Sequence, residues 1–201
     1  CFNLKSVALP SGLISIGNRA FAYCTSLTTG DIPQSITKIG ESAFQNCIGL
    51  TSITIPENVT EIGMWAFSRC RGELVVNCNI PKTGEFDYHG VFYNSNFTKI
   101  TIGDNVTSIG DCAFGGNRDC VISSLIIGKN VLSIGRSTFF HCNIEKVFWK
   151  CSQLPIGYND IEALINYTAN SDYTSYSNFK VYPMLNSMFE VDGVKYVPTS
   201  M

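Results

Sequence analysis

The chain has 201 residues, of which 45% are hydrophobic and 15% charged. This composition supports a substantial core and excludes an intrinsically disordered chain. Fourteen basic and sixteen acidic residues leave a net charge of −2. No run of basic residues occurs, so neither nucleic acid nor an anionic membrane is an expected partner. No apolar run reaches the roughly 18 residues that a membrane-spanning helix needs, so we expect no span in this chain.

One phrase returns along the chain with small changes. "SIGNRAFAYC", which begins at Ser15, comes back as "KIGESAFQNC", "EIGMWAFSRC", "SIGDCAFGGN" and "SIGRSTFFHC". Its phenylalanines follow one another at steps of 23, 23, 25, 22 and 25 residues: Phe21, Phe44, Phe67, Phe92, Phe114 and Phe139. Self-similarity at such a period is typical of solenoids, whose units are stable only when stacked. Cys1 is in phase with Cys24, so we expect the chain to begin inside a repeat.

The elements of one unit can be predicted in chain order from the pattern L-x-x-I-x-I-P-x-x-V-x-x-I-G-x-x-A-F-x-x-C. The alternating I-x-I part predicts a short strand, which the proline ends because it has no N–H to donate. V-x-x-I predicts a second extended piece. The glycine is expected in a turn of positive φ, and A-F-x-x-C in one tight helical or 3₁₀ turn.

The same pattern divides the chain into segments. Residues 1–150 are predicted to form the solenoid, with 71–96 as a degenerate repeat that has a strand near Leu74–Val76. Ile144–Trp149 is the last strand predicted in phase. Residues 151–188 are expected to be an irregular coil or cap. Residues 189–201 are predicted to form a hairpin with Asp192-Gly193 at its turn. This hairpin could be the start of a further module.

These repeats resemble the BspA-like leucine-rich repeats, a bacterial class with a 23-residue unit of this pattern. Pro10, Pro33 and Pro56 stand where the ordinary leucine-rich repeat has Asn or Cys. The resemblance implies a right-handed, curved solenoid with a parallel β-sheet on its concave face and short extended or 3₁₀ segments on its convex side. It also implies a secreted or surface-exposed protein, some of whose relatives bind host proteins or other cells. The family is not catalytic, so no catalytic residue or cofactor is carried over.

Departures from the repeat pattern fall at three positions. Ser95 and Asn117 stand where other units have Cys, and Thr138 stands where they have Ala. These departures put the regularity of the middle coils in question, not the assignment.

Nine cysteines raise the question of metal or disulfide chemistry. No C-x-x-C occurs and only two histidines are present, so a zinc site is disfavoured. Cys24, Cys47 and Cys70 are expected to stack as buried, unpaired thiols, because parallel side chains in neighbouring coils keep their Cβ atoms too far apart for a disulfide. Four cysteines lie off this ladder, and the pattern predicts no role for them: Cys78, Cys112, Cys120 and Cys151.

No catalytic constellation is visible. His141-Cys142 could pair a nucleophile with a base, but neighbours on a tight turn point apart, so a surface His beside a core Cys is the preferred interpretation. No G-x-S-x-G, phosphate loop or H-E-x-x-H occurs. Four carboxylates fall at variable positions expected to face solvent: Glu41, Glu57, Glu61 and Asp104.

The residues between the inward aliphatics of each I-x-I strand should face outward from the sheet. The candidate ligand-facing surface on the concave face consists of Thr29, Asp31, Thr54, Lys99, Thr101, Ile126, Lys146 and Phe148. Its N-terminal half is small and polar, whereas its C-terminal half gains Ile126 and Phe148. An exposed apolar pair needs a cover, which could be a partner or the Tyr-rich segment Tyr158–Tyr182 folded back as a cap.

The expected function is therefore a non-catalytic, extracellular or cell-surface module that binds a protein or a glycan, with host-derived ligands among the candidates. A scaffold of repeats that presents a surface, without a catalytic constellation, favours this hypothesis. Two alternatives remain open: a structural spacer, and an accessory domain of a larger secreted protein such as a carbohydrate-active enzyme.

Overall fold

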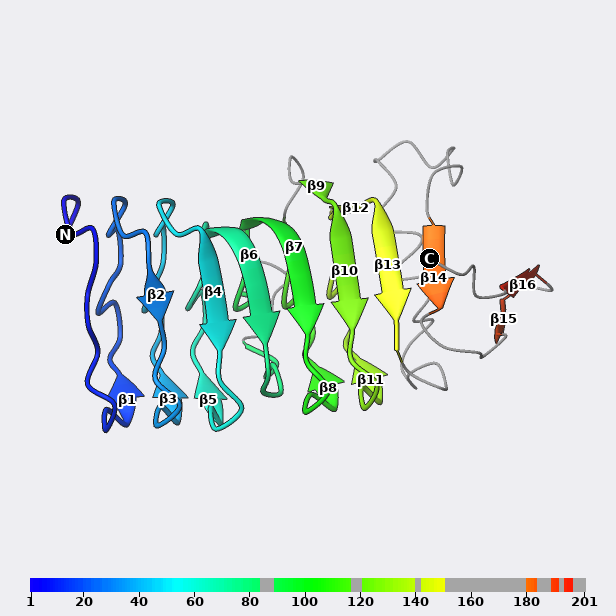
Figure 1. Cartoon of the computed structure of the whole chain (residues 1–201), viewed down its shortest axis with the longest axis horizontal. Helices are drawn as coiled ribbons and strands as arrows, with labels where there is room; N and C mark the ends of the chain where they lie inside the picture. The colour runs from blue at the N-terminus through cyan, green and yellow to red at the C-terminus, as the bar shows by residue number, and fades with distance from the viewer. Residues whose placement is uncertain are drawn as a thin grey trace.

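The computed structural model describes residues 1–83, 89–116, 121–139, 142–150, 180–183, 189–191 and 194–196. Every regular element among these residues is a β-strand. Figure 1 shows the coils stacked along the long axis of the molecule, and from the second coil onward they add strands to one large sheet. The chain is therefore a parallel β-solenoid, which confirms the predicted fold class.

The large sheet holds seven strands in the order β14-β13-β10-β7-β6-β4-β2. Their bounds are β2 Gly30–Asp31, β4 Ser52–Ile55, β6 Arg71–Val76, β7 Asn96–Ile102, β10 Ser124–Ile127, β13 Lys146–Trp149 and β14 Lys180–Pro183. All neighbours pair in parallel, and the inward aliphatics fall in register, with Ile53 beside Leu74 and Leu74 beside Ile100. The alternation in I-x-I thus predicts the strands of this sheet correctly as far as β13.

The second side of each coil is the predicted V-x-x-I extended piece, shortened to two residues. These strands form a three-stranded sheet of β1 Ser15–Ile16, β3 Lys38–Ile39 and β5 Glu61–Ile62, and a pair of β8 Ser108–Ile109 and β11 Ser133–Ile134. A further pair, β9 Val121–Ile122 and β12 Asn143–Ile144, leads into the main sheet. The degenerate repeat lies between the β1-β3-β5 sheet and the β8-β11 pair. On this side of the coil its described residues form one isolated bridge, between Ile80 and Ile109.

The third side departs from expectation. The A-F-x-x-C segment is not a helical or 3₁₀ turn but a series of overlapping turns, in which Ala22 N donates to Arg19 O and Cys24 N to Phe21 O. The alternate amides point along the solenoid instead, so that Phe21 N donates to Ala43 O at 2.8 Å. Backbone donors on this side are therefore shared between the coil itself and its successor.

The prediction of a positive φ at the repeat glycine is wrong. The left-handed conformation falls on other residues of the turn, such as Trp65 (φ 57°) and Arg69 (φ 58°). Gly63 is required for a different reason: a Cβ there would lie 2.4 Å from the amide nitrogen of Glu41 in the preceding coil. The glycine permits two backbones to approach closely, rather than a special turn.

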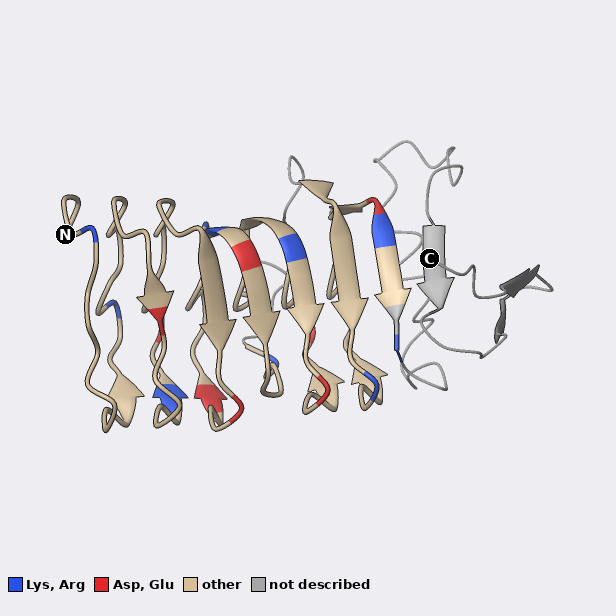
Figure 2. Ribbon diagram, viewed as in Figure 1, with Lys and Arg blue, Asp and Glu red and all other residues tan. Residues whose placement is uncertain are grey.

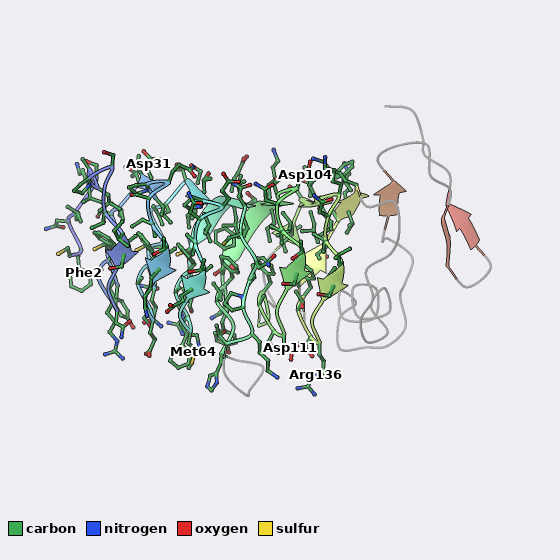
Figure 3. The ribbon with its side chains drawn as sticks, turned by 90° about the horizontal axis from the view of Figure 1, so that it is seen from below. Phe2, Asp31, Met64, Asp104, Asp111 and Arg136 are labelled. Atoms are coloured by element: carbon green, nitrogen blue, oxygen red, sulfur yellow. The ribbon has the colours of Figure 1, made fainter. Side chains whose placement is uncertain are left out.

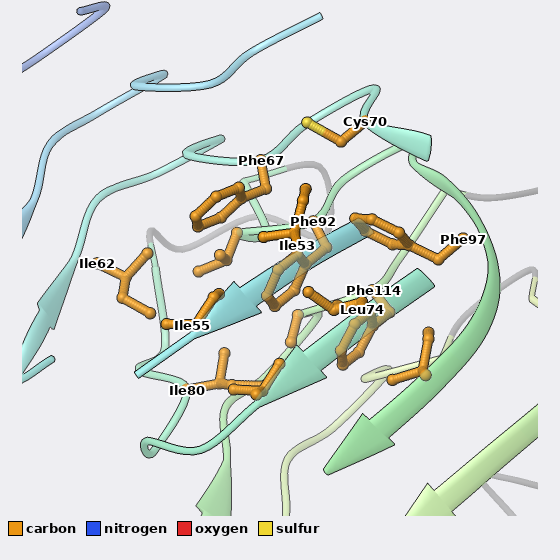
Figure 4. Close-up of a cluster of buried hydrophobic side chains, with 14 of the residues drawn as sticks. Ile53, Ile55, Ile62, Phe67, Cys70, Leu74, Ile80, Phe92, Phe97 and Phe114 are labelled. Carbon is orange, nitrogen blue, oxygen red and sulfur yellow. The ribbon is translucent and has the colours of Figure 1, made fainter. Parts of the chain in front are cut away.

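The core between the three sides is organised around a column of phenylalanines (Figure 4). Successive rings stack with centroids 5.1, 5.2, 5.7, 4.6 and 5.1 Å apart through Phe21, Phe44, Phe67, Phe92, Phe114 and Phe139. Phe97 meets Phe92 edge-on at 5.9 Å. The predicted column is confirmed, and only its first member, Phe21, is half-buried.

The predicted last strand, Ile144–Trp149, is confirmed as the end of β12 and the whole of β13. The sheet continues into β14, which pairs in parallel with β13 and was not predicted. Two later strands, β15 Phe189–Val191 and β16 Val194–Tyr196, pair antiparallel, and the expected Asp192-Gly193 turn between them lies outside the described residues.

Phe67→Ala should lower the free energy of unfolding by about 3–5 kcal/mol, because it leaves a cavity in the middle of the column. Phe21→Ala is the matched control: its ring has one stacking neighbour and is half-buried, so its loss should cost clearly less. Urea denaturation followed by circular dichroism measures both. Equal losses for the two variants would contradict the stacked-column description.

Arg69→Gly should raise the free energy of unfolding relative to Arg69→Ala by about 1 kcal/mol. Arg69 is exposed and has φ of 58°, a conformation that glycine adopts without the steric cost that a Cβ incurs. Both substitutions remove the same side chain, so their difference isolates the backbone. The same denaturation experiment applies, and an alanine variant as stable as the glycine variant would show that the turn carries no strain.

Candidate functional site

The outer face of the main sheet carries two rows of side chains that run across the strands. The first row contains Ser52, Glu73, Lys99 and Ser124 in direct register, with Thr29 before β2 at one end and Lys146 at the other. The second row consists of Asp31, Thr54, Val75, Thr101, Ile126 and Phe148. All eight residues chosen from the sequence therefore lie on one face.

Glu73 and Val75 complete these rows and were missed by sequence reasoning. They belong to the degenerate repeat, where the spacing from Cys70 to the strand is two residues shorter than in the preceding unit. The signal was present in the alternation of "ELVV", in which Leu74 and Val76 are inward and buried. Strand register, rather than distance along the chain, places them.

The second row changes character along the solenoid. Asp31 and Thr54 are exposed, whereas Val75, Ile126 and Phe148 are half-buried, with Thr101 between Val75 and Ile126. Neighbouring strands in a sheet lie about 4.8 Å apart, so these residues follow one another side by side across the sheet. We call the residues Val75, Thr101, Ile126 and Phe148 the apolar row. It is a solvent-facing strip of mixed Thr and hydrophobic character.

Few charged side chains lie beside the apolar row, and two of them, Lys99 and Glu73, are of opposite sign and form a pair. Lys99 Nζ lies 3.9 Å from a carboxylate oxygen of Glu73 in the next strand, and Lys146 is exposed further along the same row. Figure 2 shows these three charged positions on β6, β7 and β13. Surface pairs of this kind contribute little to stability, about 0–1 kcal/mol, so their main effect is on which ligand charges the face accepts.

The C-terminal end of the apolar row lies next to β14. Phe148 is half-buried, and its backbone is paired in register with that of Tyr182 in β14. The proposed cap, Tyr158–Tyr182, lies outside the described residues except for its β14 part. The choice between a cap and a partner as the cover of Phe148 therefore stays a prediction.

The cysteine position of the repeat has a defined hydrogen-bonding role. The thiol of Cys47 donates to Phe21 O at 3.0 Å, and the thiol of Cys70 donates to Phe44 O at 3.1 Å. Ser95 stands at the same position, and its hydroxyl donates to Phe67 O at 2.8 Å. The Cys-to-Ser departure is therefore conservative, because both side chains link one coil to the phenylalanine carbonyl of the coil before it.

Burial makes these thiols chemically inert. Cys24, Cys47 and Cys70 are buried and unpaired, as predicted. Burial, with a smaller contribution from the neighbouring Cys24, raises the pKa of Cys47 to about 12. The pKa of Cys70 is also raised, mainly by burial, and that of Cys78 is raised to about 11 for the same reason. A nucleophilic thiolate is disfavoured at neutral pH at each site.

Two further cysteines, Cys112 and Cys142, are also buried. Cys142 is buried and its thiol donates to Phe114 O at 3.2 Å, while His141, Cys120 and Cys151 lie outside the described residues. Cys112 is buried, and its thiol donates to Arg136 O at 3.7 Å. Within the described ranges, no group of three or more His, Cys, Asp or Glu side chains comes together to hold a metal ion.

The variable carboxylates link different coils. Glu61 accepts from Lys38 at 2.6 Å and Glu41 lies 3.9 Å from Arg19, each in the preceding coil. Asp104 lies 3.8 Å from Lys150, which belongs to the second coil beyond it. Glu57 accepts a hydrogen bond from the Asn105 amide, which belongs to the second coil beyond it. Figure 3 shows Asp31 and Asp104 along one side of the molecule and Met64, Asp111 and Arg136 along the opposite side. The carboxylates are therefore spread over several surfaces and do not converge.

The repeat geometry and the sequence pattern are matched by a family model. The model for the BspA type leucine-rich repeat region matches six copies, over residues 1–117 and 87–189. The chain belongs to the BspA type leucine-rich repeat family. The search among curated proteins finds no match.

A solved structure also resembles this BspA type chain: a leucine-rich repeat protein from Bacteroides ovatus ATCC 8483. Its sequence is 24% identical, the match covers 72% of this chain and 49% of the other, and the TM-score is 0.33. The present chain thus spans about half the length of that relative. Among the described residues, no helix is long and apolar enough to cross a membrane.

The buried thiols should resist alkylation in the folded protein. Iodoacetamide at pH 8 should label Cys1, which is exposed, but not Cys24, Cys47 or Cys70; in denaturant without reductant it should label all four. Mass spectrometry of peptides measures the result. Disulfide-linked peptides, or labelling of Cys70 as fast as of Cys1, would contradict the description.

The raised thiol pKa values also set a pH dependence. A group with a pKa raised from its ordinary value of 9.0 stabilises the fold below pH 9 and loses that contribution as the pH rises toward the folded value, about 12 for Cys47. The free energy of unfolding should therefore fall between pH 9 and 12. Cys70→Ser, which retains the donor to Phe44 O, should make this fall smaller, because one thiol with a raised pKa is removed. An unchanged fall would argue against titration of the thiols.

Proposed function

We propose that this solenoid is a non-catalytic interaction module of a bacterial surface or secreted protein, which binds a protein or glycan ligand on the outer face of its main sheet. One observation carries the proposal: the parallel register aligns Val75, Thr101, Ile126 and Phe148 into a continuous solvent-facing row. Family membership supports the repeat-module part, and the inert thiols and dispersed carboxylates favour binding over chemistry.

The physical argument concerns what the face can offer. A row of half-buried hydrophobic side chains on a rigid sheet needs little ordering on binding, which lowers the entropic cost of association. Lys99 and Lys146 flank the row, with Glu73 pairing one of them, so the face has both apolar area and polar handles. Loops and faces held by rigid scaffolds are the usual binding surfaces of solenoids.

The experiment uses the purified chain on an array of glycans and host proteins. Hits are then measured by surface plasmon resonance with the double variant Ile126→Ser plus Phe148→Ser. The matched control is Asp31→Ser plus Thr54→Ser, on the polar half of the same row. The first double variant should weaken binding tenfold or more, a loss of about 1.4 kcal/mol, and the control should not.

Other outcomes separate the alternatives. Equal binding by both double variants would place the ligand site elsewhere on the coil. No hit with a folded chain would favour a structural spacer. Circular dichroism of each variant confirms that the fold is intact, so that a loss of binding is not a loss of structure.

A further inference from the structure

The charged side chains in the two rows on the outer face of the main sheet are sorted by sign along the solenoid. The carboxylates of the rows are Asp31 in β2 and Glu73 in β6. The amines are Lys99 in β7 and Lys146 in β13 (Figure 2). Glu145 precedes β13 and lies outside the rows. From β7 to β13 the rows therefore carry lysine without a carboxylate, on the same half of the face as the hydrophobic side chains.

The lysines of the first row fall on alternate strands. Ser124 in β10 is paired in register with Lys99, and the register of β10 with β13 puts Lys146 on the other side of Ser124. Neighbouring strands lie about 4.8 Å apart, so the two lysine positions are about 10 Å apart along the stack. An extended ligand that lies across the strands meets an amine, a hydroxyl and an amine in turn.

The opposite flank of the apolar row has no side chains in its middle. Gly103 and Gly128 take the next outward positions after β7 and β10, and Gly103 N continues the ladder by donating to Val76 O at 2.8 Å. A Cβ at Gly103 would lie 2.3 Å from Oδ1 of Asn77, and one at Gly128 would lie 2.3 Å from O of Gly103. The apolar row is therefore bordered by polar side chains on one flank and by bare backbone on the other, which suits a broad, flat ligand.

Pyranose rings have the shape and the chemistry that this surface matches. One face of a β-linked ring consists of C–H groups, which pack on hydrophobic side chains such as Ile126 and Phe148, and its edge carries hydroxyl groups that hydrogen-bond to Ser124. In an extended polysaccharide, one ring advances by about one strand spacing. A carboxylate on every second ring would therefore recur at the separation of Lys99 and Lys146.

We propose that the outer face of the main sheet binds an extended acidic polysaccharide that carries a uronate on alternate sugar rings. The chain lies across the strands, with ring faces on Ile126 and Phe148 and carboxylates at Lys99 and Lys146. The apolar row supplies contact area, and the two lysines select the charge. This inference rests on the proposed function of the same face and names the class of ligand that the face takes.

An acidic peptide matches the face less well. An extended peptide presents side chains to one side at intervals of about 6.8 Å, because each residue rises about 3.4 Å. Carboxylates at that interval fall out of step with the amines of Lys99 and Lys146, which are about 10 Å apart. A bound peptide strand also pairs its backbone with an open sheet edge, and the face of a paired sheet offers none.

Isothermal titration calorimetry with hyaluronan tests the ligand class, because glucuronate alternates with a neutral N-acetylated sugar in this polymer. The probe is an oligosaccharide of about ten sugars, and its matched control is the same oligosaccharide with the carboxyl groups reduced to alcohols. The acidic form should bind with a Kd of about 100 μM or tighter, and the reduced form at least tenfold more weakly. Raising NaCl from 50 to 300 mM should weaken binding of the acidic form about tenfold, since two ionic contacts are screened.

Charge variants test whether the lysines of the face are responsible. Lys99→Gln plus Lys146→Gln should weaken binding of the acidic oligosaccharide at least tenfold. Lys38→Gln removes an exposed amine of β3, outside the main sheet, and should leave binding unchanged. Glu73→Gln should strengthen binding about threefold, because the Glu73 carboxylate lies 3.9 Å from Lys99 Nζ and competes with the ligand. A structural role alone would not produce this gain.

Four results would overturn the proposal. The first is no binding of the acidic oligosaccharide by the folded chain, and the second is equal binding of the acidic and reduced forms. The third is a lysine double variant that binds as well as the parent. The fourth is polyglutamate of similar length that binds as tightly as hyaluronan and loses binding in the lysine variant, which would assign the face to acidic peptides. Circular dichroism confirms the fold of each variant.

The proposal for the ligand class and the proposal for the binding face fail in different ways. An array ligand that loses binding in Ile126→Ser plus Phe148→Ser, but not in the lysine double variant, would leave the binding face in place and overturn the acidic polysaccharide. An absence of binding by any array ligand and by the oligosaccharide would overturn both.

Discussion

Stacking of one coil on the next at the spacing of a β-sheet is the constraint on which this structure depends. Successive phenylalanine rings lie 4.6–5.7 Å apart, close to the roughly 4.8 Å between neighbouring strands. At this spacing, the backbone and the phenylalanine ring of one coil meet their equivalents in the next, and the thiol or hydroxyl meets a phenylalanine carbonyl of the coil before it. A residue is therefore selected by what lies one coil away rather than by its neighbours in sequence.

This constraint explains features that look unrelated. Gly63 and Gly135 are glycine because the preceding backbone occupies the place of a side chain. Cys70 and Ser95 are interchangeable because each has one donor for a phenylalanine carbonyl in the coil before it. The same geometry removes reactivity from the thiols, since burial raises the pKa of Cys47 to about 12. The cysteine thiols therefore act as hydrogen-bond donors between coils rather than as nucleophiles.

The degenerate repeat shows how much irregularity the stack tolerates. Three residues separate Val76 from Ile80, whereas six separate Ile55 from Ile62, so the turn after the main strand is shorter in this coil. On that side the short strands fall into two separate groups, and Glu57 contacts Asn105 two coils away. The main sheet and the phenylalanine column continue through the same coil without a break. Continuity of the core and of the outer face therefore survives a local change in a surface turn.

The sequence by itself determined the repeat, the strand of each unit, the phenylalanine column and the buried thiols, because each of these follows from side-chain period and polarity within one unit. It also placed all eight candidate residues on one face, since alternation in a strand sets the direction of each side chain. The role of the repeat glycine could not be predicted, because the group that requires it lies in a different coil. The motif "IG" is compatible with a positive φ. The amide of Glu41 beside Gly63 shows instead that the glycine permits a close approach of two backbones.

Glu73, Val75 and β14 were missed for a related reason. Their spacing from the previous repeat is irregular, so only the register of hydrogen bonds between strands places them in the rows of the sheet. Tertiary structure decided every feature that depends on which residues lie one coil apart. In a solenoid these contacts are set by pairing between strands, and the pairing absorbs insertions and deletions that a fixed period in the sequence does not follow.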